Sequence, residues 1–133
     1  MLPIDFESVR LFLHVLAATI WVGGQITLGA LVPVLRRAGA DLPRLVARHF
    51  GRVAWTAYAV LIATGIWNMA EYDGKDRNGY DTTIGLKLGF VALSGLAAYI
   101  HQRGGSRIAL AAGGAAAMLF ALGALFLGIV LAQ

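Results

Sequence analysis

Apolar residues form four long blocks along the chain, and most charged residues lie between these blocks. A helix that crosses a bilayer needs about 20 predominantly apolar residues, and each block is about that long. The pattern therefore predicts four membrane-spanning helices, over about residues 9–35, 50–70, 83–101 and 107–132. Four spans nearly exhaust the 133 residues, so the predicted fold class is all-α, a single-domain integral membrane four-helix bundle.

The segments between the predicted spans alternate in charge. Residues 34–52 hold five arginines and one aspartate, residues 71–81 hold four acidic and two basic residues, and the short third segment holds Arg103 and Arg107. Because loops rich in arginine and lysine stay in the cytoplasm, the first and third segments are predicted to be cytoplasmic. Both termini and the second segment are then expected to face outward, and the inner (plasma) membrane of a bacterium is the expected location.

Composition supports a membrane protein and narrows its chemistry. The chain is 59% hydrophobic and 14% charged, whereas soluble domains carry roughly 25% charged residues. The net charge of +4 reflects the arginines of the loops, so the partner expected is a lipid bilayer and not a nucleic acid. The chain has no cysteine, which excludes disulfides, thiolate metal sites and the attachment of c-type haem.

One face of the first predicted span carries side chains that can form hydrogen bonds. His14, Ala18, Trp21 and Gln25 follow helical spacing and share this face. An ionisable group inside a membrane is expensive, and is by default a functional-site hypothesis. Two interpretations are open: His14 and Gln25 form hydrogen bonds with a neighbouring helix, or His14 binds a metal or haem, since neutral imidazole is a common metal ligand.

The third predicted span carries a similar face with Lys87, Ser94, Ala98 and His101. Lys87 and His14 each lie about one turn below the outer boundary, so we expect the two at similar depth. Both would face the bundle interior if their faces do. The alternative is that the Lys87 ammonium extends to the outer headgroups.

Two further histidines and one methionine are weaker candidates for metal ligands. His101 is roughly 21 Å from Lys87 along the helix, so His101 and His14 are not expected to bind the same iron. His49 and His101 lie at similar depth near the inner boundary, either as a second metal site or as headgroup-level residues. Met69 lies at a depth comparable to His14, and a thioether suits Cu(I); otherwise it is a core residue.

The fourth predicted span and the aromatic residues have structural interpretations. Small residues recur four apart at Ala109/Gly113 and Ala124/Gly128, a spacing that lets membrane helices approach closely. We expect this span to pack within the bundle, or to form the interface of a homo-oligomer or of a larger membrane complex. Five aromatic residues are expected in the two interfacial belts, namely Trp55, Trp67, Tyr72, Tyr80 and Tyr99.

The run His14–Gly24 (HVLAATIWVGG) resembles the first span of CopD-type copper-resistance membrane domains and of HemJ-type protoporphyrinogen oxidases. The resemblance continues at residues 50–54, 63–67 and 87–91. HemJ-type proteins are membrane proteins with haem b that rely on a histidine in span one and a lysine in span three. The corresponding residues here are His14 and Lys87.

This resemblance implies a haem-b-binding redox protein that exchanges electrons with a quinone or oxidises a tetrapyrrole. His14 would be an axial ligand, and Lys87 a second ligand, a propionate partner or the catalytic residue that positions an anionic substrate. The other pocket residues implied are Trp21, Gly24, Tyr58 and Gly65. Two alternatives are a CopD-like copper transport or tolerance protein using His14 and Met69, and a cofactor-free accessory subunit.

Overall fold

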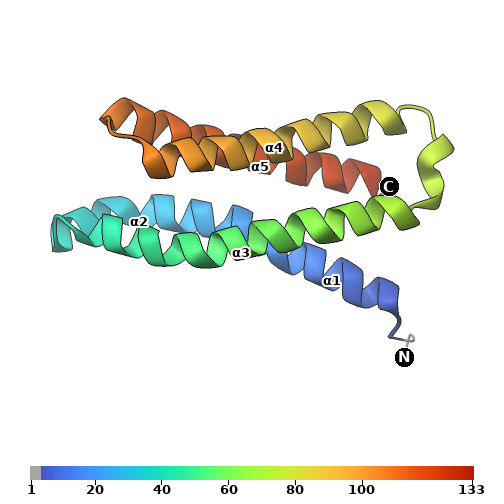
Figure 1. The fold of residues 1–133 in the computed structure, drawn as a ribbon, viewed down its shortest axis with the longest axis horizontal. Coiled ribbons are helices and arrows are strands. Elements are labelled where there is room, and N and C mark those ends of the chain that lie inside the picture. The colour runs from blue at the N-terminus through green and yellow to red at the C-terminus, as the bar shows by residue number, and fades with distance from the viewer. Residues whose placement is uncertain (1–3) are drawn as a thin grey trace. The chain divides into compact units, whose positions relative to one another are not determined.

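The structure is a computed structural model, and it describes residues 4–133. These residues form only helices and short connections (Figure 1), which confirms the all-α fold class. The first three helical segments are continuous: α1 (Phe6–Ala18), the π-helix η1 (Thr19–Gly23) and α2 (Gly24–Ala38). The remaining elements are α3 (Leu42–Glu71), the 3₁₀-helix η2 (Asp73–Asp76), α4 (Tyr80–Arg103) and α5 (Arg107–Leu131).

Four helical stretches are long and apolar enough to cross a membrane. They cover Phe6–Ala38, Leu42–Glu71, Tyr80–Arg103 and Arg107–Leu131. Even the shortest, of 24 residues, extends about 36 Å at the rise of an α-helix, which exceeds the roughly 30 Å of a hydrocarbon core. Only 17% of each apolar window is buried, as expected where lipid is the solvent. The chain therefore has the properties of an integral membrane protein.

The predicted first connecting segment is much shorter than its charge pattern indicated. Residues 34–52 were expected to connect two spans, but α2 continues to Ala38 and α3 begins at Leu42, so only residues 39–41 are outside helices. Arginine, alanine and leucine are strong helix formers, so the helices continue beyond the apolar blocks and carry the arginines on their ends. The predicted orientation depends on which ends hold the arginines and remains a prediction.

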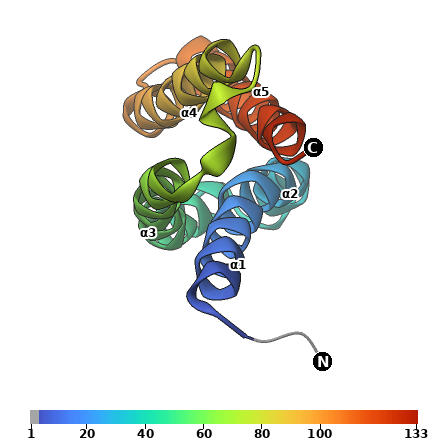
Figure 2. The same ribbon diagram turned by 90° about the vertical axis from the view of Figure 1, so that its right-hand side faces the viewer.

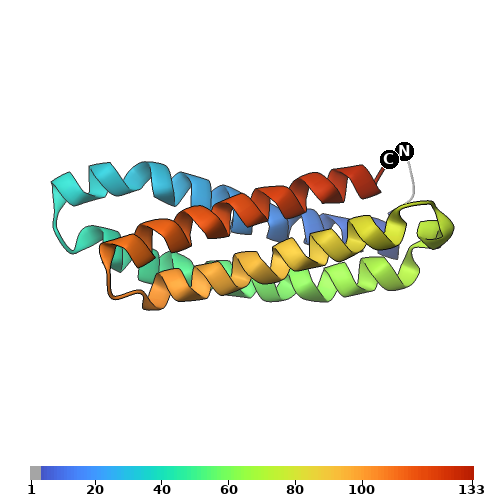
Figure 3. The ribbon, with the colours of Figure 1, turned by 90° about the horizontal axis from the view of Figure 1, so that it is seen from above.

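The described chain divides into two compact units, one ending at Tyr72 and the other beginning at Asp73. The first unit, here the first hairpin, consists of α1, η1 and α2 packed against α3 (Figure 2). The second unit, the second hairpin, consists of α4 and α5 lying side by side (Figure 3), joined by residues 104–106.

Small residues bring the helices of the first hairpin close together. Ala17 of α1 and Ala54 and Ala57 of α3 are all at most 5% exposed. A Cβ atom at Gly24 would lie 2.3 Å from the ring of Phe50. Gly24 therefore provides the space in which the Phe50 side chain packs.

The π-helix η1 interrupts the first span at Trp21. The wider turn of a π-helix often marks a functional site, and the sequence analysis did not predict it. The Gln25 side chain donates a hydrogen bond to the Trp21 carbonyl at 2.9 Å. This hydrogen bond lies within the helix of Gln25 itself and does not reach a neighbouring helix, as had been expected for Gln25.

In the second hairpin α5 packs against α4 through its small residues. Ala117, Ala121 and Ala124 are 2%, 3% and 7% exposed. Ser94 of α4 is 1% exposed and donates a hydrogen bond to the Ala117 carbonyl at 2.8 Å. The prediction that the fourth span is a packing helix is confirmed, and α4 is its partner within the chain.

Two glycines of α5 accommodate large side chains of α4. A Cβ atom at Gly123 would lie 2.7 Å from the Phe90 ring, and one at Gly128 would lie 3.1 Å from the Lys87 Nζ atom. Phe90 also contacts Phe120, with 5.8 Å between ring centroids. Gly128, which the small-residue spacing predicted as a helix contact, therefore receives the Lys87 side chain, and Gly123, which the spacing did not single out, receives the Phe90 ring.

Candidate functional site

His14 of α1 forms a hydrogen bond with Thr64 of α3, and the geometry indicates which nitrogen carries the proton. His14 Nδ1 lies 2.8 Å from Thr64 Oγ1, and that oxygen lies 2.7 Å from the Val60 carbonyl oxygen. Because a carbonyl can only accept, the Thr64 hydroxyl donates to Val60 and accepts from the Nδ1–H of His14. In the neutral imidazole the lone pair is then on Nε2. Metal-ligating histidines commonly donate their other ring N–H to a neighbouring group, so this tautomer is compatible with such a role.

Three contacts establish an antiparallel register between α1 and α3. The rings of Trp21 and Tyr58 are in contact, and His14 forms a hydrogen bond with Thr64. The Arg10 guanidinium lies 6.0 Å from the Trp67 ring centroid. Each turn toward the N-terminus of α1 is therefore matched by a turn toward the C-terminus of α3.

This register places Arg10 opposite Asn68, one turn from the His14–Thr64 pair. Arg10 is 9% exposed and Thr64 is 5% exposed. We call Arg10, His14, Thr64 and Asn68 the polar cluster. The sequence analysis identified only His14 of these four, although Arg10 lies four residues before His14, and Asn68 four after Thr64, at helical spacing.

An aromatic cluster follows the polar cluster along the same helix contact. The ring centroids of Trp21 and Tyr58 are 4.5 Å apart, and those of Trp21 and Trp55 are 5.4 Å apart. Trp55 and Tyr58 meet edge to face at 5.5 Å. Trp55, expected to stand in the inner aromatic belt, thus packs with the two aromatic residues that were predicted to line a pocket.

The two glycines predicted as pocket residues have different surroundings. A Cβ atom at Gly65 would lie 3.4 Å from His14 Cε1, so Gly65 lies directly beside the imidazole edge. The corresponding space at Gly24 is filled by the Phe50 ring. Of the two, Gly65 is the one next to His14.

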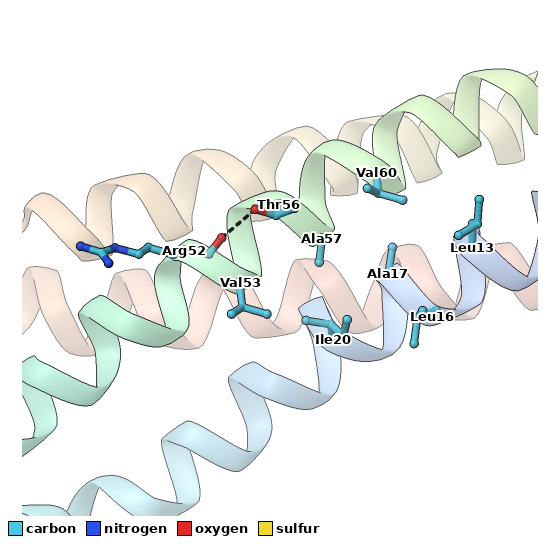
Figure 4. A pocket seen from close by; sticks show the side chains of 9 residues that line it. All are labelled: Leu13, Leu16, Ala17, Ile20, Arg52, Val53, Thr56, Ala57 and Val60. Atoms are coloured by element: carbon cyan, nitrogen blue, oxygen red, sulfur yellow. Dashed lines mark hydrogen bonds between the residues drawn. The ribbon is translucent and has the colours of Figure 1, made fainter.

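An apolar groove of about 480 Å³ runs between α1 and α3 (Figure 4). No residue of the polar cluster lines it. Its only polar lining groups are Arg52 and Thr56, and the Thr56 hydroxyl donates to the Arg52 carbonyl at 2.9 Å. The other lining residues are Leu13, Leu16, Ala17, Ile20, Val53, Ala57 and Val60. The groove and the polar cluster are therefore separate features of the first hairpin.

Lys87 lies in the second hairpin, half-buried over the α5 backbone at Gly128. Its ammonium group fits there because Gly128 has no side chain. His14 and Lys87 belong to different units, so the predicted meeting of these two residues remains a prediction.

The other candidate metal ligands have local structural contacts. His49 Nδ1 donates to the Leu45 carbonyl of its own helix at 3.0 Å. His101 Nδ1 donates to the Leu110 carbonyl of α5 at 2.5 Å, and its ring packs on Gly114. Met69 is half-buried on α3. Within residues 4–133, no three His, Cys, Asp or Glu side chains come together to hold a metal ion.

No family model matches the chain, and no curated protein or solved structure shows significant similarity to it. The fold and the site therefore define the class: an all-α integral membrane protein whose first hairpin contains a polar cluster centred on His14.

Proposed function

We propose that the protein is a haem-b-binding membrane redox protein and that His14 is an axial ligand of the iron. The observation that carries the proposal is the hydrogen bond from His14 Nδ1 to Thr64 Oγ1. It fixes the tautomer whose Nε2 lone pair can bind iron, and it orients the ring from a neighbouring helix. The likeness of the run His14–Gly24 to the first span of HemJ-type oxidases supports the same assignment.

Three properties of His14 and its neighbours support the haem proposal. Histidine is a common axial ligand of haem iron, and the polarity around the ring tunes its potential. Gly65 has no side chain beside the imidazole, and His14 Cε1 lies 3.4 Å from the position that a Cβ atom would take there. Arg10, one turn away, supplies a permanent positive charge, which suits the carboxylates of a macrocycle.

The bound haem would supply one-electron transfer, with a quinone or a tetrapyrrole as the redox partner. Trp21 and Tyr58 pack against each other about two helical turns from His14 along the same helix contact. Under this proposal Lys87 serves as the second ligand, as a propionate partner or as the group that positions an anionic substrate.

The test is the absorption spectrum of the full chain purified in a mild detergent and supplied with haem. We expect a Soret band with the features of axial histidine ligation, and its loss in His14→Ala. His49→Ala is the matched control, because the His49 imidazole donates only to its own helix among the contacts described and should leave the spectrum unchanged.

Three results would contradict the proposal. A His14→Ala variant that keeps full haem occupancy would exclude His14 as a ligand. A colourless protein that binds Cu(I), and loses it in both His14→Ala and Met69→Leu, would identify the CopD-like copper protein instead. A folded protein that binds neither would favour the cofactor-free accessory subunit.

A further inference from the structure

Arg10 is a buried cation with only weak partners. Its side chain lies 3.8 Å from the carboxylate of Glu7, which is itself 65% exposed. Its guanidinium lies over the Trp67 ring at 6.0 Å. Among residues 4–133, the buried Nε atom of Arg10 has no hydrogen-bond partner. Arginine stays charged in proteins, and a buried charge is expensive unless it is paired and hydrogen-bonded.

Asn68 is the second group of this region with an unsatisfied atom. Its Oδ1 atom is buried and has no hydrogen-bond partner in the described part of the chain. The register of α1 and α3 places Asn68 opposite Arg10. Because the oxygen and nitrogen of an amide can exchange places, Asn68 can present either an acceptor or two donors. Arg10 Nε and Asn68 Oδ1, each without a hydrogen-bond partner among the described residues, therefore lie at the same level of the contact between α1 and α3.

The acidic residues around this region do not complete it. The Asp5 carboxylate is engaged by the backbone N–H and the hydroxyl of Ser8, at 2.8 and 2.7 Å. Glu7 and Glu71 are exposed. Of the acidic side chains that the structure describes, Glu7 alone forms an ion pair with Arg10, at 3.8 Å.

Arg10 lies near the N-terminal end of the first span, where we expect the lipid headgroups. It is the fifth residue of α1, which begins at Phe6, so it lies about 6 Å along the axis from the helix start. Trp67 covers the guanidinium, and tryptophan is enriched at this level of the membrane.

We propose that Arg10 and Asn68 bind an oxyanion carried by an amphiphile in this leaflet. The guanidinium fork matches the paired oxygens of a phosphate or carboxylate, and the Asn68 amide can donate to a third oxygen. The oxyanion comes either from a phospholipid headgroup or from the carboxylate of a bound tetrapyrrole. Only the second source rests on the proposed haem function.

The experiment is a binding titration of the delipidated full chain, followed by native mass spectrometry. One arm uses phosphatidylglycerol, with dioleoylglycerol as the phosphate-free reference, and the other uses protoporphyrin IX. Arg10→Lys keeps the charge but removes Nε and the fork, and should weaken binding about ten- to a hundredfold, as expected for lost hydrogen bonds to a charged group. Asn68→Asp places a carboxylate opposite Arg10 and should weaken binding as strongly.

Arg77→Gln is the control for net charge, since Arg77 is exposed in the connection beside α3. Its binding should equal that of the unaltered chain. His14→Ala should keep phosphatidylglycerol binding, so failure of the haem proposal and failure of this one give different results.

Binding of phosphatidylglycerol that depends on Arg10 identifies a lipid headgroup, and binding of the porphyrin alone identifies a cofactor carboxylate. Equal affinity in Arg10→Lys and the unaltered chain overturns the proposal, as does a loss in Arg77→Gln as large as that in Arg10→Lys. If the Arg10 variants do not fold, the Arg10 Nε–H signal of the unaltered chain in NMR decides: it should exchange more slowly with water on ligand addition, and an unchanged rate refutes the site.

Discussion

Replacement of Thr64 by valine tests the hydrogen bond on which the site depends. Valine has almost the same shape but no hydroxyl, so the substitution removes the acceptor of the part-buried His14 Nδ1–H. Thr64 is 5% exposed, so water does not readily replace the lost contact.

The magnitude follows from the environment of the bond. Hydrogen bonds between membrane helices contribute about 0.6 kcal/mol on average and at most about 1.7, while a buried donor left without a partner costs about 1–3 kcal/mol. The substitution also removes the hydrogen bond from the Thr64 hydroxyl to the Val60 carbonyl. Because that carbonyl belongs to helix α3, the loss of this second hydrogen bond should matter little. We expect Thr64→Val to lower the free energy of unfolding by about 1–3 kcal/mol.

Thr56→Val is a matched control within the same helix. The Thr56 side chain is exposed, and its hydroxyl donates to the Arg52 carbonyl of its own helix at 2.9 Å. The control substitution should change stability by less than about 0.5 kcal/mol, as is usual for surface positions.

The assay is reversible denaturant unfolding in mixed micelles, followed by circular dichroism and arranged as a double-mutant cycle with His14→Phe. A coupling energy of about 0.5 kcal/mol or more between positions 14 and 64 is expected for residues in direct contact. If Thr64→Val and Thr56→Val have equal effects and the coupling is zero, the His14–Thr64 bond does not stabilise the hairpin and the tautomer argument fails.

Three further predictions concern other parts of the chain. Hydrogen bonds from Ser8 to the Asp5 carboxylate lower the pKa of Asp5 below its usual 3.8. The stabilisation of α1 by Asp5 should therefore be present above pH 3.8 and be lost as the pH falls through the lowered pKa. The difference in melting temperature between Asp5→Ala and the unaltered chain should vanish in acid, and a difference that persists there would contradict this prediction. Lys87→Met should alter the haem spectrum or occupancy if the Lys87 amine reaches the cofactor, whereas an unchanged spectrum would remove the main link to the HemJ-type family. Reporter fusions at Gln133 should report an outward-facing C-terminus, and a cytoplasmic signal would reverse the predicted topology.

The sequence was sufficient to predict the number of spans and the side on which His14 packs. Block length and hydropathy determine the first, and the helical spacing of His14, Ala18 and Trp21 determines the second. The role of the fourth span was also predictable, because small residues four apart have few other uses in a membrane helix.

The partners of His14 could not be predicted in the same way. Thr64 is 50 residues away in the chain, and only the register of two packed helices selects it from the other polar residues of the second span. Arg10 was overlooked because a charge near the end of a span is commonly an interfacial anchor. The role of Gly24 was misjudged, since the sequence indicates space at a glycine but not the Phe50 ring that fills it.

The helices of the two hairpins pack through different kinds of side chain, and this difference bears on the proposed function. In the second hairpin Ser94 and His101 donate to backbone carbonyls of α5, and small residues of α5 and the Phe90–Phe120 pair form much of the remaining contact. Such packing needs no matched polar side chains. The first hairpin also has small residues at its contact, yet it adds a histidine, a threonine and a buried arginine at one end.

Polar groups of this kind are expensive in a membrane and are rarely kept for packing alone. The His14–Thr64 pair and Arg10 are therefore the residues of the first hairpin on which the proposed function depends. Lys87 is the corresponding exception in the second hairpin, where Gly128 makes room for its ammonium group. Gly128→Ala would displace this group without removing its charge. Comparison of this variant with Lys87→Met separates the position of the amine from its presence. A change in the haem absorption spectrum of both variants would mean that the amine must be held in position. A change in Lys87→Met alone would mean that only the charge is needed.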